Sequence, residues 1–277
     1  MSINPLLEST SFRLPGETVK LPSLALFYDN TVVDDTVLIE GEVYVQPMTT
    51  YEELLMKTPE LIYSGQALTQ VFGKCIPQIK QPMQLLAKDV DFLLIALRKI
   101  SLGSVVTITH THTCDDAHEH NYNVDVSSFI KDTNNVDPST VTTLFEATLD
   151  NGQIVKLKPY TMGAVLSLSQ TAVAQQDKLE AMSELELVNY MRDSILLNIL
   201  PAIVSVGDVT DENHILEWLN NLPMAWIKRL NATIENTNAW GVDFTTEQVC
   251  KDCGESFTTI VPLNPLSFFT EPSGLEM

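Results

Sequence analysis

The sequence predicts an α+β fold that combines mixed helical layers with short antiparallel β elements. Segments of β-branched residues with alternating polarity occur at 36–45, 104–113 and 121–126, which is typical of half-buried strands. Between and after them, apolar residues recur at spacings of three and four, which is typical of amphipathic helices. Two cysteine-containing turns indicate a third component, a degenerate zinc-ribbon-like knuckle.

The chain of 277 residues is long enough to bury roughly three quarters of its unfolded surface, so we expect a substantial core. We divide it into five consecutive segments. They are an N-terminal arm and β segment at 1–47, a helical region at 48–103, a β region with a Cys/His knuckle and a hairpin at 104–160, a second helical region at 161–241, and a C-terminal cysteine knuckle, strand and tail at 242–277.

Local signals support the boundaries of several elements. Ser183 with Glu186 forms a capping box before an amphipathic run, and Asp211 is placed to begin a further helix. Asp89 precedes an apolar stripe that ends at Gly103, so we expect Asp89 to cap that helix. The sequence Asp-Asn-Gly at 150–152 separates LFEATL from QIVKLK, which predicts a β-hairpin.

The charge of the chain restricts its partners. Sixteen Lys and Arg against 36 Asp and Glu leave a net charge of −20, which repels nucleic acids and anionic membranes. The start of the chain has no basic stretch followed by an apolar one, and no apolar run approaches the ~20 residues that cross a bilayer. We expect a cytoplasmic protein whose acidic surface faces either solvent or a basic protein.

Cysteines and histidines are concentrated in two places. Cys250 and Cys253 have the C-x2-C spacing of a zinc knuckle, and Gly254 permits the tight turn. One such pair supplies half of the ligands that a tetrahedral zinc ion needs. The other concentration is the segment 110–120, which contains Cys114 and four of the five histidines. A zinc ribbon is likewise built from two half-sites that lie apart in the sequence.

We predict a structural zinc ion and no catalytic or cofactor-binding residue. The residue in register with Cys253 is Ala117, so a histidine must complete the first half-site. The ligands that we favour are Cys114, His118, Cys250 and Cys253, with His112 and His120 as substitutes. The alternative is a half-dismantled ribbon in which side-chain packing has replaced the metal.

Catalytic zinc is the other alternative, because Glu119 lies between two histidines. The zinc deaminase pattern also requires Pro-Cys-x2-Cys, whereas Val249 precedes Cys250. P-loops, dinucleotide-binding glycine motifs and nucleophile elbows do not occur in the sequence. We therefore expect a protein that is not an enzyme.

Several motifs together resemble a known family. They are LPS followed by Leu26-Phe27-Tyr28, GQALTQVFGKCI, DVDFLLIALRKISLGSVVTI, a cysteine knuckle leading into YNVDV, and CKDCGESF ahead of PLSFF. The chain resembles the baseplate hub subunits of T-even-like contractile-tailed bacteriophages, from about Leu21 to Phe269. Ala117 departs from the family pattern, in which the first knuckle tends to carry two cysteines.

The resemblance implies a structural or assembly protein of the central hub, without catalysis. It also implies a multi-subunit complex with other baseplate and tail proteins, located in the tail of the virion and, during assembly, in the host cytoplasm. A dedicated assembly chaperone that is absent from the finished particle is the alternative.

Overall fold

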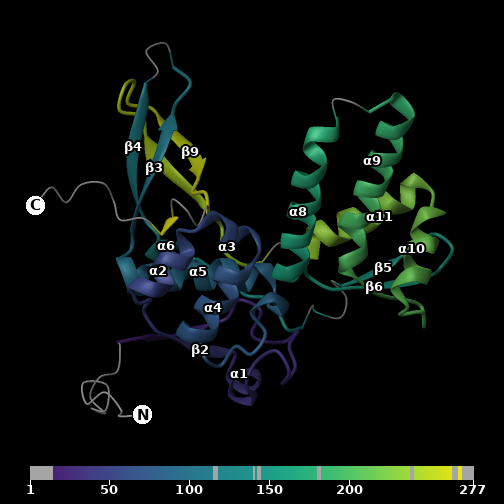
Figure 1. The fold of residues 1–277 in the computed structure, drawn as a ribbon, viewed down its shortest axis with the longest axis horizontal. Helices are drawn as coiled ribbons and strands as arrows, with labels where there is room; N and C mark the ends of the chain where they lie inside the picture. The colour runs from purple at the N-terminus through teal and green to yellow at the C-terminus, as the bar shows by residue number, and fades with distance from the viewer. Residues whose placement is uncertain are drawn as a thin grey trace, which may run out of the picture.

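The computed structural model describes residues 15–114, 118–139, 141, 145–179, 182–237, 240–263 and 268–269. They form two lobes that lie side by side (Figure 1). The first lobe is built around a core of residues from Val19 to Phe129 together with residues between Val242 and Phe269. The second lobe has its own core, of residues between Ala147 and Ile234. The second lobe is thus inserted in sequence between two parts of the first.

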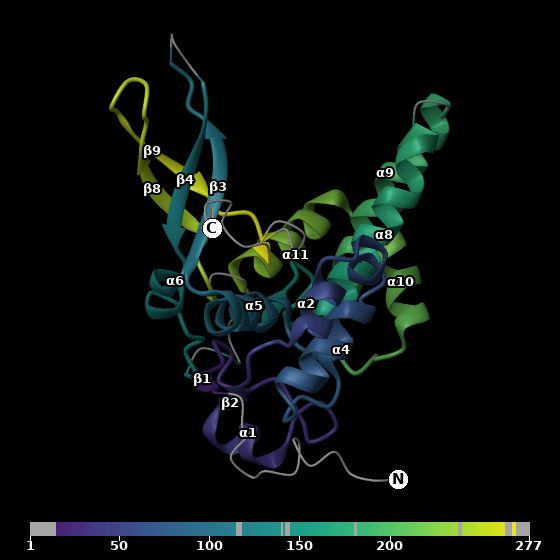
Figure 2. The ribbon, with the colours of Figure 1, turned by 60° about the vertical axis from the view of Figure 1, so that its left-hand side comes forward.

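The first lobe consists of short helices and three separate two-stranded antiparallel sheets, which pair β1 with β2, β3 with β4 and β8 with β9. Its elements are β1 (Glu17–Lys20), α1 (Asp35–Glu40), β2 (Glu42–Val45), α2 (Thr50–Met56), α3 (Pro59–Tyr63), α4 (Gln66–Cys75), the 3-10 helix η1 (Pro82–Gln84), α5 (Ala87–Leu102), β3 (Val105–Thr111), β4 (Glu119–Asp125), α6 (Ser127–Lys131), β8 (Thr245–Val249) and β9 (Ser256–Ile260). The buried α5 crosses the middle of this lobe (Figure 2).

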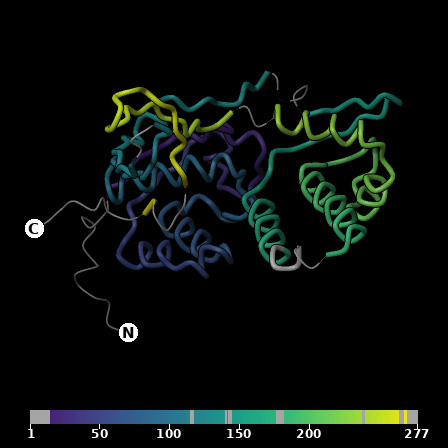
Figure 3. The backbone as a smooth tube through the Cα atoms, turned by 90° about the horizontal axis from the view of Figure 1, so that it is seen from above, coloured from purple at the N-terminus to yellow at the C-terminus, as the bar shows by residue number. Residues whose placement is uncertain are grey.

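The second lobe combines a three-stranded antiparallel sheet, in the order β5-β6-β7, with four helices. Its elements are β5 (Glu146–Thr148), β6 (Ile154–Leu157), α8 (Met162–Leu179), α9 (Glu184–Ile199), the 3-10 helix η2 (Leu200–Ala202), β7 (Ile203–Val206), α10 (Glu212–Asn220) and α11 (Met224–Thr237). Helices α8 and α9 rise together from the body as an arm, seen from the side in Figure 2 and from above in Figure 3.

The α+β fold is confirmed, as are the hairpin, in which Thr148 pairs with Ile154, and the capping box of α9. The structure differs at 36–40, where the sequence predicts a strand and the chain forms α1. The signal that marks this helix is Gly41, which adopts φ +70° and donates its N–H to Val37 as a C-terminal cap. Strands β7 and β8, of four and five residues, were also not predicted.

The segments where the chain leaves the first lobe and finally re-enters it lie side by side. Asn134 and Gly241 exchange two backbone hydrogen bonds of 3.1 and 2.7 Å. Gly241 has φ +100°, and a Cβ atom there would lie 2.9 Å from the side chain of Lys88. Only glycine therefore suits this junction, which brings the C-terminal segment back to the first core.

Asp89 does not cap α5, as the sequence suggested. The helix begins at Ala87, and the Asp89 carboxylate points into the protein, where it is fully buried. It accepts hydrogen bonds from the backbone N–H of Ser23 (3.0 Å) and from the hydroxyls of Ser23 and Tyr28 (2.5 Å each). The hydroxyl of Tyr28 in turn accepts from the N–H of Leu86 at 2.9 Å. Asp89 thus fastens the LPS segment to the central helix.

The stability of the protein should depend on the protonation of Asp89. Burial raises its pKa to about 6, although the hydrogen bonds from Ser23 and Tyr28 lower it. In the unfolded chain the pKa is about 3.9, so between pH 4 and 6 the folded state holds a proton that the unfolded state releases. The stability from this group is therefore lost as pH rises through that window, by roughly 3 kcal/mol.

The comparison of wild type with Asp89→Asn isolates this effect, because asparagine does not titrate and the other groups are shared. We expect the unfolding free energy of wild type, minus that of the variant, to fall as pH rises from 4 to 6 in urea titrations. A difference that stays constant or grows with pH would show that the hydrogen bonds outweigh the cost of burying the charge.

Arg98 joins three parts of the first lobe. Its side chain is fully buried, and its guanidinium donates to the backbone carbonyls of Phe268 (2.9 Å), Gly103 (2.8 Å) and Val105 (2.9 Å). Phe268 and Phe269 are themselves buried in the first core. Arg98 therefore links the C-terminal segment to the end of α5 and the start of β3.

Candidate metal centre

Two hairpins far apart in sequence, β3–β4 and β8–β9, lie side by side (Figures 1 and 2). Phe257 of β9 lies at their contact, with ring centroids 4.6 Å from His110, 5.1 Å from His112 and 5.4 Å from Tyr122. Residues two apart on a strand share a face, so His110 and His112 both face Phe257. This packing brings the loop that follows β3 next to the loop that joins β8 to β9.

Four side chains meet where these loops approach each other. Each of His112, Cys114, Cys250 and Cys253 offers one ligand atom, and these atoms all lie within 4.8 Å of one another. In a tetrahedral zinc site, bond lengths of about 2.0–2.3 Å place the ligand atoms roughly 3.3–3.8 Å apart. The His112 Nδ1 to Cys253 Sγ distance is 3.5 Å. One imidazole and three thiolates fit zinc in their chemistry, and this distance fits its tetrahedral geometry.

The turn after β8 presents both of its cysteines to the site. The N–H of Cys250 donates to the carbonyl of Glu255 at 2.9 Å, and the N–H of Gly254 donates to the carbonyl of Cys250 at 3.0 Å. Gly254 has φ +78°, a conformation that glycine adopts without strain. The sequence predicted this turn from the C-x2-C-Gly pattern.

The thiols influence one another's ionisation. Donation by the backbone N–H of Cys253 lowers the pKa of Cys250 to about 6. Burial, followed by the interactions with Cys250 and Cys253, raises the pKa of Cys114 to about 11. In the absence of a metal ion, a thiolate in this cluster therefore opposes the ionisation of a neighbouring thiol. A divalent cation reverses this, because a coordinating thiol loses its proton.

The structure brings together three of the four favoured ligands, and the fourth side chain beside them is His112, which the sequence offered as a substitute. His118 and His120 lie instead around Asp252, the third residue of the C-x2-C turn. The Nε2 of His120 is 2.8 Å and the Nδ1 of His118 3.5 Å from its carboxylate, which also accepts the backbone N–H of His118 at 3.0 Å. Ala117 lies outside the described residues.

Asp252 was not singled out in the sequence, where nothing marks it beyond its place between two cysteines. Its hydrogen bond with His120, followed by that with the N–H of His118, holds its pKa below the usual value. Beside it, the Nζ of Lys251 donates to the carbonyl of Asn121 and lies 5.1 Å from the ring centroid of Tyr122. Both residues of the C-x2-C turn that lie between the cysteines thus contact the first hairpin.

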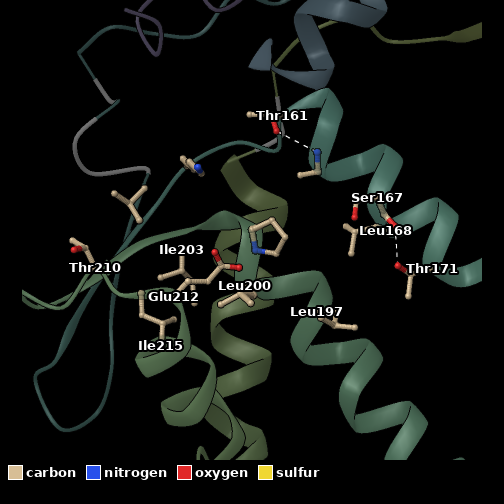
Figure 4. Close-up of a pocket in the computed structure, with 14 residues that line it drawn as sticks. Thr161, Ser167, Leu168, Thr171, Leu197, Leu200, Ile203, Thr210, Glu212 and Ile215 are labelled. Carbon is tan, nitrogen blue, oxygen red and sulfur yellow. Dashed lines mark hydrogen bonds between the residues drawn. The ribbon is translucent and has the colours of Figure 1, made fainter. Parts of the chain in front are cut away.

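A separate cleft of about 540 Å³ lies in the second lobe, between α8 and the segment from η2 to α10. Figure 4 shows Ser167, Leu168 and Thr171 of α8 on one side, with Leu200 and Ile203 opposite. Of the residues that line it, only Lys158 and Glu212 are charged. The other side chains that line it are apolar or carry a hydroxyl.

Comparison with known protein families shows to which family the chain belongs. A family model described as T4 bacteriophage base plate protein matches residues 30–270, which is most of the chain. The chain belongs to this family. No curated protein and no solved structure matches the chain.

Membership makes the chain a structural component of a T4-like bacteriophage baseplate, located in the tail of the virion, and implies contact with other baseplate proteins. Among the described residues, no helix is both long and apolar enough to cross a membrane.

Proposed function

We propose that this baseplate protein is a non-enzymatic subunit of the central hub of a contractile tail, and that it acts through contacts with other tail proteins. The observation that supports the proposal is a contact between the two segments in which the resemblance to hub subunits is most specific. Arg98, from the segment that begins at Asp89, binds the carbonyl of Phe268, which follows the C-terminal knuckle. The polar residues of these segments hold the fold together, which favours a structural role over catalysis.

The orientation of Glu119 also favours a non-catalytic role. Glu119 pairs with Thr111 in the β3–β4 ladder, and paired residues share a face of the sheet. Thr111 adjoins His112 and therefore points to the opposite face. Glu119 thus faces away from the four clustered side chains, whereas a hydrolytic zinc site needs its general base beside the metal.

The proposal also includes a structural zinc ion held by His112, Cys114, Cys250 and Cys253. These residues come from both hairpins, so the ion would join segments that are 141 positions apart in the sequence. Zinc bound by four protein ligands has no open position for substrate, which is typical of structural sites.

Two histidine variants test which side chain binds the metal. His112→Ala removes a ligand, and we expect the affinity for zinc to fall by more than about 100-fold. His118→Ala removes a contact with Asp252 but no ligand, so we expect a smaller loss, of no more than about 10–100-fold. Competition with a zinc-binding dye measures both constants. The opposite order of the two losses would assign His118 as the ligand.

Mass spectrometry of tails and of hub assembly intermediates tests the location. We expect the chain in both, in contact with hub proteins, and we expect phage that lack it to form no complete baseplates. The chain in intermediates but not in finished tails would instead identify an assembly chaperone. Normal baseplates in phage that lack the chain would contradict the proposal.

A further inference from the structure

An apolar stripe runs along α9, and its two halves have different surroundings. Near the C-terminal end of the helix, Leu196 and Ile199 are buried in the second core, with α10 and α11 alongside. Toward the N-terminal end, Leu185 is 72% exposed, Val188 61% and Met191 55%. Grouped apolar side chains with this exposure mark interaction sites more often than scattered ones do. The stripe thus continues beyond the part of the protein that covers it.

The exposed half of the stripe points away from α8. The space between α8 and α9 is lined on the α9 side by other residues, namely Glu186, Asn189, Tyr190, Asp193, Ser194 and Leu197. With 3.6 residues per turn, this set occupies one side of the helix and leaves Val188 and Met191 on the other. Helix α8 therefore leaves these two side chains open to a partner.

The stripe leads into a groove of about 150 Å³ where α9, α10 and α11 meet. Ile195, one helical turn after Met191, lines this groove together with Leu219 and Ile227. Met224, at the start of α11, also lines it and is 55% exposed. The exposed stripe thus leads into a mainly apolar groove, whose lining also includes Arg192 and Asn220. Such a surface is of the kind on which the apolar face of a helix packs.

Charge distinguishes between two possible occupants of this surface, a second copy of the chain and a helix of another protein. Glu184 lies on the exposed stripe, one and two helical turns before Val188 and Met191, and Arg192, which lines the groove, is paired with Asp193 at 2.7 Å. A second copy of this chain would bring together two molecules that each carry a net charge of −20 and therefore repel each other. A helix with Lys or Arg flanking its apolar face would instead gain a favourable interaction with Glu184 and with the acidic molecule as a whole.

We propose that the outer face of α9, with the groove at its base, is a docking site for an amphipathic helix of another tail protein. The apolar side chains of that helix pack on Val188 and Met191, and a Lys or Arg side chain at its edge lies beside Glu184. The inference rests on the proposed function only for the source of the helix.

Site-specific photo-cross-linking during phage infection tests this inference. The photoreactive residue benzoylphenylalanine replaces Val188 in one variant and Ile39 in a matched control. Ile39 is an apolar residue of α1 in the other lobe, 84% exposed, so both replacements leave the cores intact. We expect Val188 to yield a cross-link that mass spectrometry locates in a basic, amphipathic helical segment of a different tail protein. We expect the Ile39 position not to reach that segment.

Three outcomes would overturn the inference: a cross-link to a second copy of this chain, a cross-link to lipid, or no more product from position 188 than from position 39. Different results would reject the proposed function and the docking site. A cross-link to a basic helix of a protein outside the tail would keep the docking site and reject the hub assignment. A chain that is present in baseplates but yields no cross-link at 188 would reject the docking site alone.

Discussion

Replacement of Arg98 by methionine is expected to lower the free energy of unfolding by about 4 kcal/mol. Methionine fills much of the space of the arginine stem but donates no hydrogen bond. The carbonyls of Phe268, Gly103 and Val105 would then lose buried donors, and each such loss costs about 1–3 kcal/mol. Denaturation in urea measures the change.

Arg192→Met is the matched control, because the Arg192 side chain is about half exposed and its pair with Asp193 lies at the surface. Exposed ion pairs contribute about 0–1 kcal/mol, so this variant should stay within that range of wild type. Hydrogen exchange gives a second readout, since the loss of Arg98 should release the segment around Phe268 first. An Arg98→Met variant as stable as the control would contradict the role of Arg98 in joining the C-terminal segment to α5.

Removal of zinc is expected to have the second large effect. A metal ion that joins residues 141 positions apart restricts the unfolded chain as a cross-link does, which corresponds to about 5 kcal/mol in the chain-entropy model. We therefore expect a strong chelator, or the variant Cys250→Ala, to lower stability by several kcal/mol. Exchange should rise first in β8 and β9, because the metal would supply part of what holds this hairpin to β3 and β4.

The control for this experiment is Cys75→Ala, which removes the thiol that lies in the first core, away from the cluster. The chelator should destabilise this variant by as much as it destabilises wild type, whereas it should have no further effect on Cys250→Ala. Equal stability of wild type with and without chelator would show that side-chain packing alone joins the hairpins.

Strong local signals in the sequence were sufficient for several elements. The capping box at Ser183, the hairpin at 150–152 and the glycine of the C-x2-C turn are each determined by neighbours within a few residues. The approach of Cys114 to Cys250 was also predicted, because half a zinc site requires a second half elsewhere. The α+β class followed from the same periodicities.

Features that depend on distant residues were harder to predict. Asp89 occupies a position where the sequence suggests a helix cap, and only the approach of Ser23 and Tyr28 shows that it faces inward. The choice between His112 and His118 depends on Phe257, which packs against the face of β3 that carries His112. Spacing along the chain contains no information about either contact.

The zinc content of the purified protein tests most directly whether a metal joins the two hairpins. Native mass spectrometry of protein prepared with zinc and without chelators should show one zinc ion per chain in wild type and in Cys75→Ala, and none in Cys250→Ala. The cysteines of the site should resist alkylation until the metal is removed. Folded wild-type protein that carries no metal, and in which Cys114, Cys250 and Cys253 all react freely, would contradict the account.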